Sequence, residues 1–162
     1  MIETEPRLVT ENEIVAFSTD TVNGIAISAK NRLNEIHLSR LKKRDLNKKI
    51  IILVSSIEQA KQFPEWDENA EKQAKINWPG SVSLIVNNQG FRMPKQKKLL
   101  KFLELNGPFF ATSANISDEP IIENLEDIKK VFPKIKSVFN FGKTSNHPSK
   151  IIDVNSNKIL RD

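Results

Sequence analysis

Three hydroxyl side chains and one carboxylate lie together at residues 18–21, where an apolar run at residues 14–17 ends. The cluster reads Ser-Thr-Asp-Thr, and a second apolar run begins after Gly24. An open α/β sheet binds small polar ligands at the ends of its strands, so such a cluster could form part of a binding site. The same residue types also favour turns. Taken alone, the stretch is therefore more typical of a turn between two strands than of a site.

Five further stretches place polar groups at the edge of an apolar run. They are residues 42–44 with Lys48, residues 78–80 with Ser83, residues 92–94, residues 111–115, and residues 147–153 with Arg161. Together they supply separated cations, hydroxyls and amides, but no evident pair of nucleophile and base. This composition suits the binding and orientation of a phosphorylated ligand, with catalysis through charge stabilisation and proximity.

Composition excludes several classes of chemistry. The chain of 162 residues has no cysteine and only two histidines, which rules out disulfides, thiolate nucleophiles and cysteine-ligated zinc. It has no apolar run of about 18 residues and no secretory signal pattern, so we expect a cytoplasmic protein with no membrane partner. The net charge of +5 favours anionic partners such as nucleotides or RNA, although a lysine-rich coding bias could produce the same excess.

The apolar patterns predict the elements that must position these groups. Short apolar runs indicate strands at residues 13–17, after Gly24, and at residues 50–54, 82–86, 91–94, 109–112, 138–141, 151–154 and 158–161. Helical spacing indicates helices at residues 31–43, 57–62, 67–76, 97–105 and 124–132. The order of elements is mixed rather than strictly alternating. It favours one α/β domain over residues 1–162, with a twisted sheet of parallel and antiparallel strands flanked by helices.

Local details follow from the same patterns. The first helix is predicted to turn Leu33, Ile36 and Leu41 toward the core, and Ser55 or Ser56 is predicted to cap the second helix. The phenylalanines mostly fall inside strand or helix patterns. This placement indicates core packing rather than a platform for stacking nucleic-acid bases.

Six motifs, in this order and at about these spacings, resemble those of the YrdC-like family, the threonylcarbamoyl-AMP synthases. They read STDTVNGI, LKKRDLNKKIIIL, WPGSVSLIV, FRMP, ATSANIS and HPSKIID, and they extend from about Ile14 to Arg161. The resemblance implies a YrdC-like fold and an enzyme that condenses L-threonine, bicarbonate and ATP to threonylcarbamoyl-AMP, releasing pyrophosphate. A downstream tRNA threonylcarbamoyl transferase would then use this product to modify the adenosine next to the anticodon.

The resemblance also bears on cofactors and domains. Mg²⁺ would accompany the ATP substrate and be held mainly through phosphates, so no metal site made by the protein is expected. Some relatives carry a second domain, and we expect none after Asp162.

Individual positions take their predicted roles from the resemblance. Four residues correspond to contacts of the substrate threonine: Thr21, Arg92, Ala111 and Ser149. Seven correspond to contacts of ATP: Lys42, Arg44, Lys48, Asn88, Ser113, Asn115 and Arg161. Planar arginines suit carboxylates, and clustered cations suit a triphosphate. From the residues alone, a solvated basic helix end stays open for Lys42 and Arg44, and helix or turn capping stays open for Ser113 and Asn115.

Eight positions depart from the family pattern. Ser18, Asn23, Asp45 and Leu53 stand where the pattern usually has Pro, Tyr, Pro and His, and Lys49, Ser81, Asp118 and Lys150 where it has Pro, Pro, Gly and Thr. Leu53 matters most because the family's histidine contacts threonine. Asp45 should weaken the field of the neighbouring cations. These departures leave open a non-catalytic relative that binds nucleotide or RNA, including tRNA, whereas the retained site residues favour the enzyme.

Overall fold

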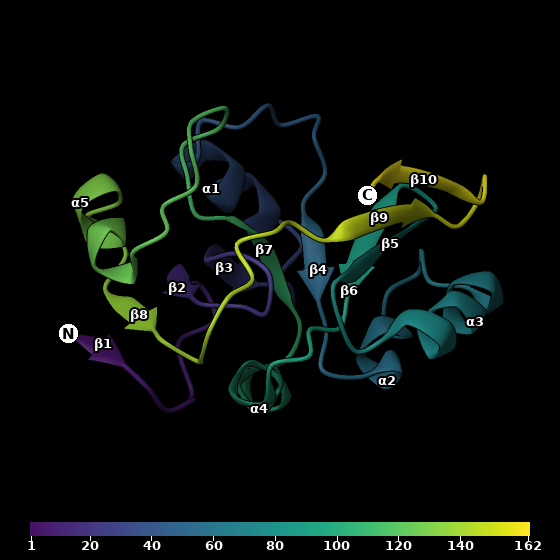
Figure 1. The fold of residues 1–162 in the computed structure, drawn as a ribbon, viewed down its shortest axis with the longest axis horizontal. Helices are drawn as coiled ribbons and strands as arrows, with labels where there is room; N and C mark the ends of the chain where they lie inside the picture. The colour runs from purple at the N-terminus through teal and green to yellow at the C-terminus, as the bar shows by residue number, and fades with distance from the viewer.

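Short apolar runs form the strands of one sheet in the computed structural model, which describes residues 1–162. The strands are β1 (Ile2–Glu3), β2 (Val15–Phe17), β3 (Gly24–Ser28), β4 (Ile51–Leu53), β5 (Val82–Val86), β6 (Gln89–Arg92), β7 (Phe109–Ser113), β8 (Ser137–Phe139), β9 (Lys150–Asp153) and β10 (Lys158–Arg161). Their order across the sheet is β1-β8-β2-β3-β7-β4-β6-β5-β9-β10, so β1 and β10 form its two edges near the two ends of the chain (Figure 1).

The sheet is mixed, as predicted. β8 runs parallel to both β1 and β2, β6 runs parallel to β4, and β9 runs parallel to β5. The other neighbouring strands are antiparallel. The two-residue strand β1 was not predicted, because so short a segment has no readable alternation.

Helices pack against two separate apolar clusters of this sheet. They are α1 (Asn34–Leu41), α2 (Ile57–Ala60), α3 (Glu68–Asn77), α4 (Lys97–Asn106) and α5 (Ile128–Val131). Side chains from α1, α2, α3 and α5 join the larger cluster, and α4 gives Leu99, Phe102 and Leu103 to the smaller one. Burial of a side chain such as Phe102 stabilises the fold by about 1.5–3 kcal/mol. None of the helices combines the length and apolar character that a membrane span requires.

The predicted cap of α2 is confirmed, and the predicted helix at residues 124–132 is wrong in its form. The Ser56 hydroxyl accepts a hydrogen bond of 3.1 Å from the backbone N–H of Gln59. At the later segment, a 3₁₀ turn, η1 (Leu125–Asp127), precedes the single helical turn of α5. Phe132 ends that turn because Pro133 follows, and a residue before proline avoids the helical region.

The predicted apolar face of the first helix is wrong in part, although Leu41 packs against the larger apolar cluster as predicted. Leu33 and Ile36 are exposed, whereas Asn34 and Leu38 are buried. Asn34 tolerates burial because its side-chain amide donates a 3.0 Å hydrogen bond to the backbone oxygen of Ser28. The buried face of α1 therefore combines the apolar Leu38 with a polar side chain held by a tertiary hydrogen bond.

The turn between β5 and β6 is tighter than predicted. Asn87 and Asn88 both have positive φ angles, 48° and 69°, which suit a two-residue hairpin turn. β6 therefore begins at Gln89, whereas the sequence predicted a turn through residue 90 and a strand at residues 91–94. Because side chains alternate along a strand, Gly90 and Arg92 lie on one face of β6.

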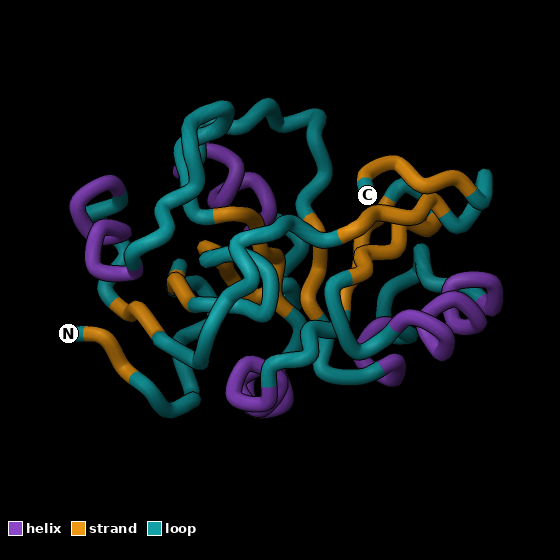
Figure 2. Tube along the Cα trace, in the orientation of Figure 1, coloured by secondary structure: helices purple, strands orange, loops and turns teal.

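Two long loops border the central strands. Residues 42–50 connect α1 to β4, and residues 114–124 follow β7. The backbone N–H of Ser117 in the second loop donates a 2.9 Å hydrogen bond to the carbonyl of Lys42 in the first. Figure 2 shows both loops beside each other at the top of the molecule, and a third loop, residues 140–149, crossing the sheet before β9.

Candidate functional site

A cavity of about 520 Å³ opens on the face of the sheet against which α4 packs. Leu53 of β4 shows that the cavity and α4 share this face, because its side chain belongs to the apolar cluster of α4 and also lines the cavity. The volume lies within the range of about 300–1,000 Å³ that is typical of small-molecule sites.

One row of the cavity floor is polar at its centre. Strand register pairs Leu53 of β4 with Arg92 of β6, and Ser83 of β5 with Ile151 of β9. β5 and β6 pair antiparallel with Leu84 opposite Phe91, so Ser83 lies next to Arg92. Neighbours in register share a face, which brings a guanidinium and a hydroxyl together between two aliphatic side chains.

The adjoining row of the floor is apolar. It contains Ala111 paired with Ile51, and Gly90 paired with Ile85. A Cβ atom on Gly90 would lie 2.9 Å from Cγ1 of Ile51, so only glycine fits at the centre of this row. The floor is consequently low and aliphatic there, a surface suited to the flat face of a ring.

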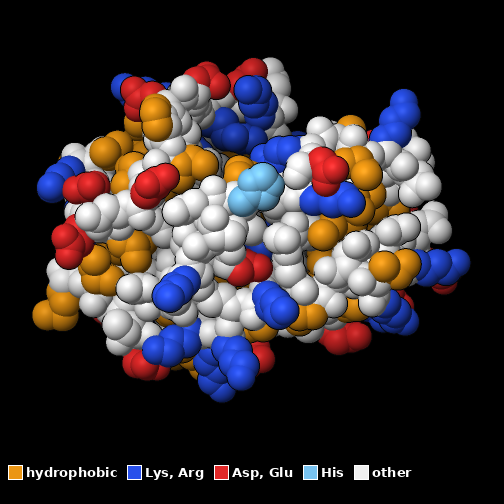
Figure 3. Space-filling model, viewed as in Figure 1, with side chains coloured by type: hydrophobic (Ala, Val, Ile, Leu, Met, Phe, Trp, Pro, Cys, Tyr) orange, Lys and Arg blue, Asp and Glu red, His pale blue; other side chains and the backbone are white.

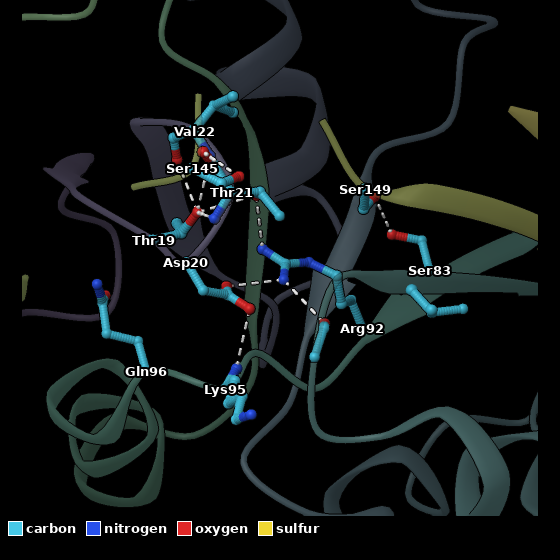
Figure 4. A network of polar contacts seen from close by, with 12 residues as sticks. Thr19, Asp20, Thr21, Val22, Ser83, Arg92, Lys95, Gln96, Ser145 and Ser149 are labelled. Atoms are coloured by element: carbon cyan, nitrogen blue, oxygen red, sulfur yellow. Dashed lines mark hydrogen bonds and ion pairs between the residues drawn. The ribbon is translucent and has the colours of Figure 1, made fainter. Parts of the chain in front are cut away.

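Arg92 is held in one orientation by three hydrogen bonds. Its Nη1 donates to Oδ1 of Asp20 (2.8 Å) and to the carbonyl of Gly80 (3.1 Å), and its Nη2 donates to the hydroxyl of Thr21 (3.1 Å) (Figure 4). The other Asp20 oxygen accepts a 3.1 Å hydrogen bond from the backbone N–H of Lys95. Asp20 thus ties the strand end at residues 18–21 to the segment that follows β6.

Arg92 keeps donors for a ligand. A guanidinium has five N–H groups, and its three internal bonds leave Nε and one hydrogen of Nη2 without a partner in the chain. Arg92 lines the cavity and only 6% of its side chain is exposed, so these donors meet little competition from water. A partly desolvated guanidinium edge of this kind recognises a carboxylate through two parallel bonds.

Five cations line the cavity, and no acidic side chain or histidine does. The cations are Arg44, Lys48, Lys49, Arg92 and Arg161. Burial lowers the pKa of Arg44 and of Arg161, and the charge of Arg92 lowers the pKa of Arg161 further. Arginine nevertheless stays protonated in proteins, so the cavity keeps a positive field. Figure 3 shows Lys and Arg side chains around the recess between the upper loops and the β9–β10 hairpin.

Three of these cations belong to the loop at residues 42–50. Nη2 of Arg44 donates a 2.9 Å hydrogen bond to the carbonyl of Lys49, and its Nε donates one of 3.4 Å to the carbonyl of Lys48. The loop therefore folds around the guanidinium of Arg44. Lys48 and Lys49 themselves are exposed at the cavity edge.

Lys42 lies beneath the cavity rather than in its wall. It is 2% exposed, and its ammonium donates to Oγ1 of Thr112 (2.8 Å), the carbonyl of Ser113 (2.7 Å) and Oδ1 of Asn115 (2.9 Å). These three acceptors match its three hydrogens, and none is a carboxylate. Burial, followed by the charge of Arg44, lowers the pKa of Lys42 to about 8.

The cavity brings together nine of the eleven predicted site residues. They are Thr21, Arg44, Lys48, Asn88, Arg92, Ala111, Ser113, Ser149 and Arg161. Lys42 and Asn115 do not line the cavity; both hydrogen-bond to Ser113, and their contact with ATP stays a prediction. The hydroxyl of Ser113 donates a 2.7 Å hydrogen bond to the same Asn115 oxygen that Lys42 contacts.

Sequence reasoning missed three contributors to the site. Asp20 orients Arg92, Thr112 anchors Lys42, and Ser83 pairs with Ser149. Asp20 and Thr112 lay inside the motifs, and Ser83 had been noted after residues 78–80. Their polarity was visible in the sequence, but their partners are distant in the chain.

Two of the departures from the family pattern hold loops and do not line the cavity. The side-chain amide of Asn23 donates to the carbonyls of Ile122 (3.1 Å) and Glu123 (2.8 Å), and the Ser18 hydroxyl accepts a 2.8 Å bond from the N–H of Phe141. Both are structural contacts at the base of the site.

Comparisons with known proteins agree with this architecture. A family profile covering Sua5, YciO and YrdC proteins, described as "Telomere recombination", matches residues 7–162. The threonylcarbamoyl-AMP synthase of Pyrococcus abyssi is 31% identical over 84% of this chain and 45% of its own length. The synthase of Hydrogenovibrio crunogenus is 26% identical over 99% of this chain and 96% of its own length.

A solved structure shares the fold. The structure of P. abyssi Sua5 complexed with L-threonine superposes with a TM-score of 0.79 at 28% identity, covering 94% of this chain and 54% of that one. The chain spans between 27% and 45% of the length of the first curated relatives that it matches.

Proposed function

The chain belongs to the family of Sua5, YciO and YrdC proteins, and we propose that it is a nucleotidyltransferase that makes threonylcarbamoyl-AMP. The reaction would condense L-threonine, bicarbonate and ATP and release pyrophosphate. The observation that carries this proposal is a cavity without acidic side chains whose cations fall into two groups. Arg44, Lys48 and Lys49 belong to one loop, while Arg92 and Arg161 lie on the sheet.

The loop cations suit the triphosphate of ATP. Arg44 is held by backbone carbonyls of its own loop, and Lys48 and Lys49 lie at the cavity edge. Such charges counter the triphosphate and stabilise the negative charge that grows on departing pyrophosphate. Mg²⁺ would be coordinated by phosphate oxygens and water, which fits a lining that offers no carboxylate ligand. Asn88 and Ser113 complete the proposed nucleotide contacts.

Of the two sheet cations, Arg92 suits the carboxylate of threonine. Nε and one hydrogen of Nη2 remain on Arg92 as donors for a ligand, and Thr21, Ala111 and Ser149 line the same cavity. A related protein, P. abyssi Sua5, binds L-threonine in its solved complex, which supports the same class of ligand here. Arg161 would lie toward the nucleotide, as the resemblance implies.

Catalysis would rest on proximity and charge. The lining offers hydroxyls but no histidine or carboxylate to act on them as a general base, so the residues act by binding the three substrates next to one another. The product would pass to a tRNA threonylcarbamoyl transferase in the cytoplasm, with contact to tRNA as a further expectation from the positive charge of the chain.

Pyrophosphate release tests the proposal. We expect purified protein with ATP, bicarbonate and Mg²⁺ to release pyrophosphate only when L-threonine is added. Arg44→Ala should raise the KM for ATP, whereas Lys98→Ala, which removes a surface cation paired with Glu5, should leave it unchanged. Binding of nucleotide, or salt-sensitive binding of RNA, without threonine-dependent pyrophosphate release would instead support the non-catalytic alternative.

A further inference from the structure

Two buried serines meet in the lining of the cavity. Ser83 lies on β5 and Ser149 directly precedes β9, and their hydroxyl oxygens are 2.7 Å apart (Figure 4). Ser149 is 5% exposed and Ser83 is 0% exposed, although both border the cavity. Ser149 is therefore the member of the pair that a ligand can reach, and Ser83 supports it from below.

Burial decides which serine donates in this pair. Ser83 has no hydrogen-bond partner for its hydroxyl other than Ser149. If Ser149 donated, the hydrogen of Ser83 would be buried without an acceptor, which is costly. The favoured arrangement is the reverse, with the Ser83 hydroxyl donating to Oγ of Ser149.

Arg161 occupies the other side of the same oxygen. Nη2 of Arg161 donates a 3.2 Å hydrogen bond to Oγ of Ser149, and its Nε donates one of 2.8 Å to the Ser149 carbonyl. A guanidinium donates and never accepts. Oγ of Ser149 thus accepts from both Ser83 and Arg161, which occupies both of its lone pairs and leaves only its hydrogen for a ligand.

We infer that Ser83 is a positioning residue that makes Ser149 an obligate hydrogen-bond donor to the substrate. The ligand atom that contacts Ser149 is then an acceptor with a free lone pair, such as a carboxylate or hydroxyl oxygen of the bound amino-acid substrate. The ammonium group of that substrate has no lone pair and does not fit there. The inference rests on the proposed function, because the ligand is taken to be L-threonine. It assigns a role to Ser83, which does not itself reach the ligand.

A double-mutant cycle tests this role. The KM for threonine, and the dissociation constant for threonine by calorimetry, are measured for the wild type, Ser83→Ala, Ser149→Ala and the double variant. Ser83→Ala should raise both constants by about 3- to 10-fold, the loss expected for one neutral hydrogen bond, with kcat and the KM for ATP within about twofold. In the Ser149→Ala background, Ser83→Ala should have no further effect, because its only target is gone.

Controls separate a positioning role from a general loss of packing. Ser28→Ala removes another buried hydroxyl, 2% exposed and outside the cavity lining, and should leave threonine binding unchanged. If Ser83→Ala does not fold, Ser83→Cys keeps a hydrogen-bonding group at this position, in a somewhat larger side chain, and weakens the donor, and the same cycle applies.

The outcomes distinguish this inference from the proposed function. The inference is overturned if Ser83→Ala binds threonine as well as wild type does. It is also overturned if the fold-changes of Ser83→Ala and Ser149→Ala in the constants for threonine multiply in the double variant. Neither result contradicts the proposed enzyme activity. A wild-type protein that neither binds threonine nor releases pyrophosphate overturns both. Non-additive losses confined to threonine, with an unaffected Ser28→Ala control, establish the positioning role.

Discussion

Replacement of Arg92 by lysine isolates the geometry of the site from its charge. A lysine at this position keeps the positive charge and can still pair with Asp20, whose carboxylate is 2.8 Å from Nη1 in the wild type. It cannot reproduce the planar fork that contacts Gly80 and Thr21 while leaving Nε and Nη2 for a ligand. Arg92→Lys should therefore damage threonine binding far more than folding.

The magnitude follows from the bonds that are lost. The free guanidinium edge is predicted to hold the threonine carboxylate through two parallel bonds, and lysine retains one point contact. Loss of one charge-assisted hydrogen bond costs about 1.5–3 kcal/mol, which corresponds to a rise of about 10- to 150-fold in the KM for threonine. The KM for ATP should change by less than about threefold, because the loop cations are untouched.

The assay is pyrophosphate release with threonine varied at saturating ATP and bicarbonate. Arg32→Lys is the matched control, because Arg32 also forms a two-pronged pair, with Glu65 at 3.2 Å and 2.6 Å, but lies outside the cavity lining. An unchanged KM for threonine in Arg92→Lys, or equal effects on threonine and ATP, would refute the carboxylate assignment.

Two more predictions concern the nucleotide. Burial lowers the pKa of Lys42 to about 8. A nearby triphosphate favours the protonated form and raises this pKa, so ATP binding takes up protons and weakens as pH rises above 8. Calorimetry in buffers of different ionisation enthalpy should detect the proton uptake in wild type and not in Lys42→Met. Gly90→Ala places a Cβ 2.9 Å from Cγ1 of Ile51 and should raise the KM for ATP at least about fivefold, with Gly142→Ala, outside the cavity lining, as the comparison in the same kinetic assay.

Most strands were predictable from their apolar runs, including β10, whose residues are exposed at the edge of the sheet. The bounds of β5 and β10 agree with the sequence prediction, and β2, β3, β4 and β7 lie within a residue or two of it. The face of α1 was not predictable, because Asn34 is buried through a hydrogen bond to Ser28 that the sequence does not reveal. Leucine spacing indicated a helix correctly but not which of its faces packs.

The site was predictable in its residue types and less so in its contacts. Motif order predicted nine lining residues, but Lys42 lies outside the lining, because the sequence shows its charge and not the groups that fold over it. Thr112 and Ser113 at the end of β7, and Asn115 just after it, surround that ammonium from 70 to 73 positions away. The role of Asp20 was hidden for the same reason, since its partner Arg92 is 72 positions distant.

Leu53 is the departure that bears most on the choice between an enzyme and a binding protein. It is 3% exposed, packs in the cluster of α4 and lies in register beside Arg92. Leucine removes the polar contact that the family's histidine would make, yet it also keeps water from the guanidinium, and an ionic hydrogen bond is stronger in a drier environment. The change weakens one contact and reinforces the Arg92 edge. It is therefore compatible with retained recognition of a carboxylate, the contact that a protein binding only nucleotide or RNA would not need.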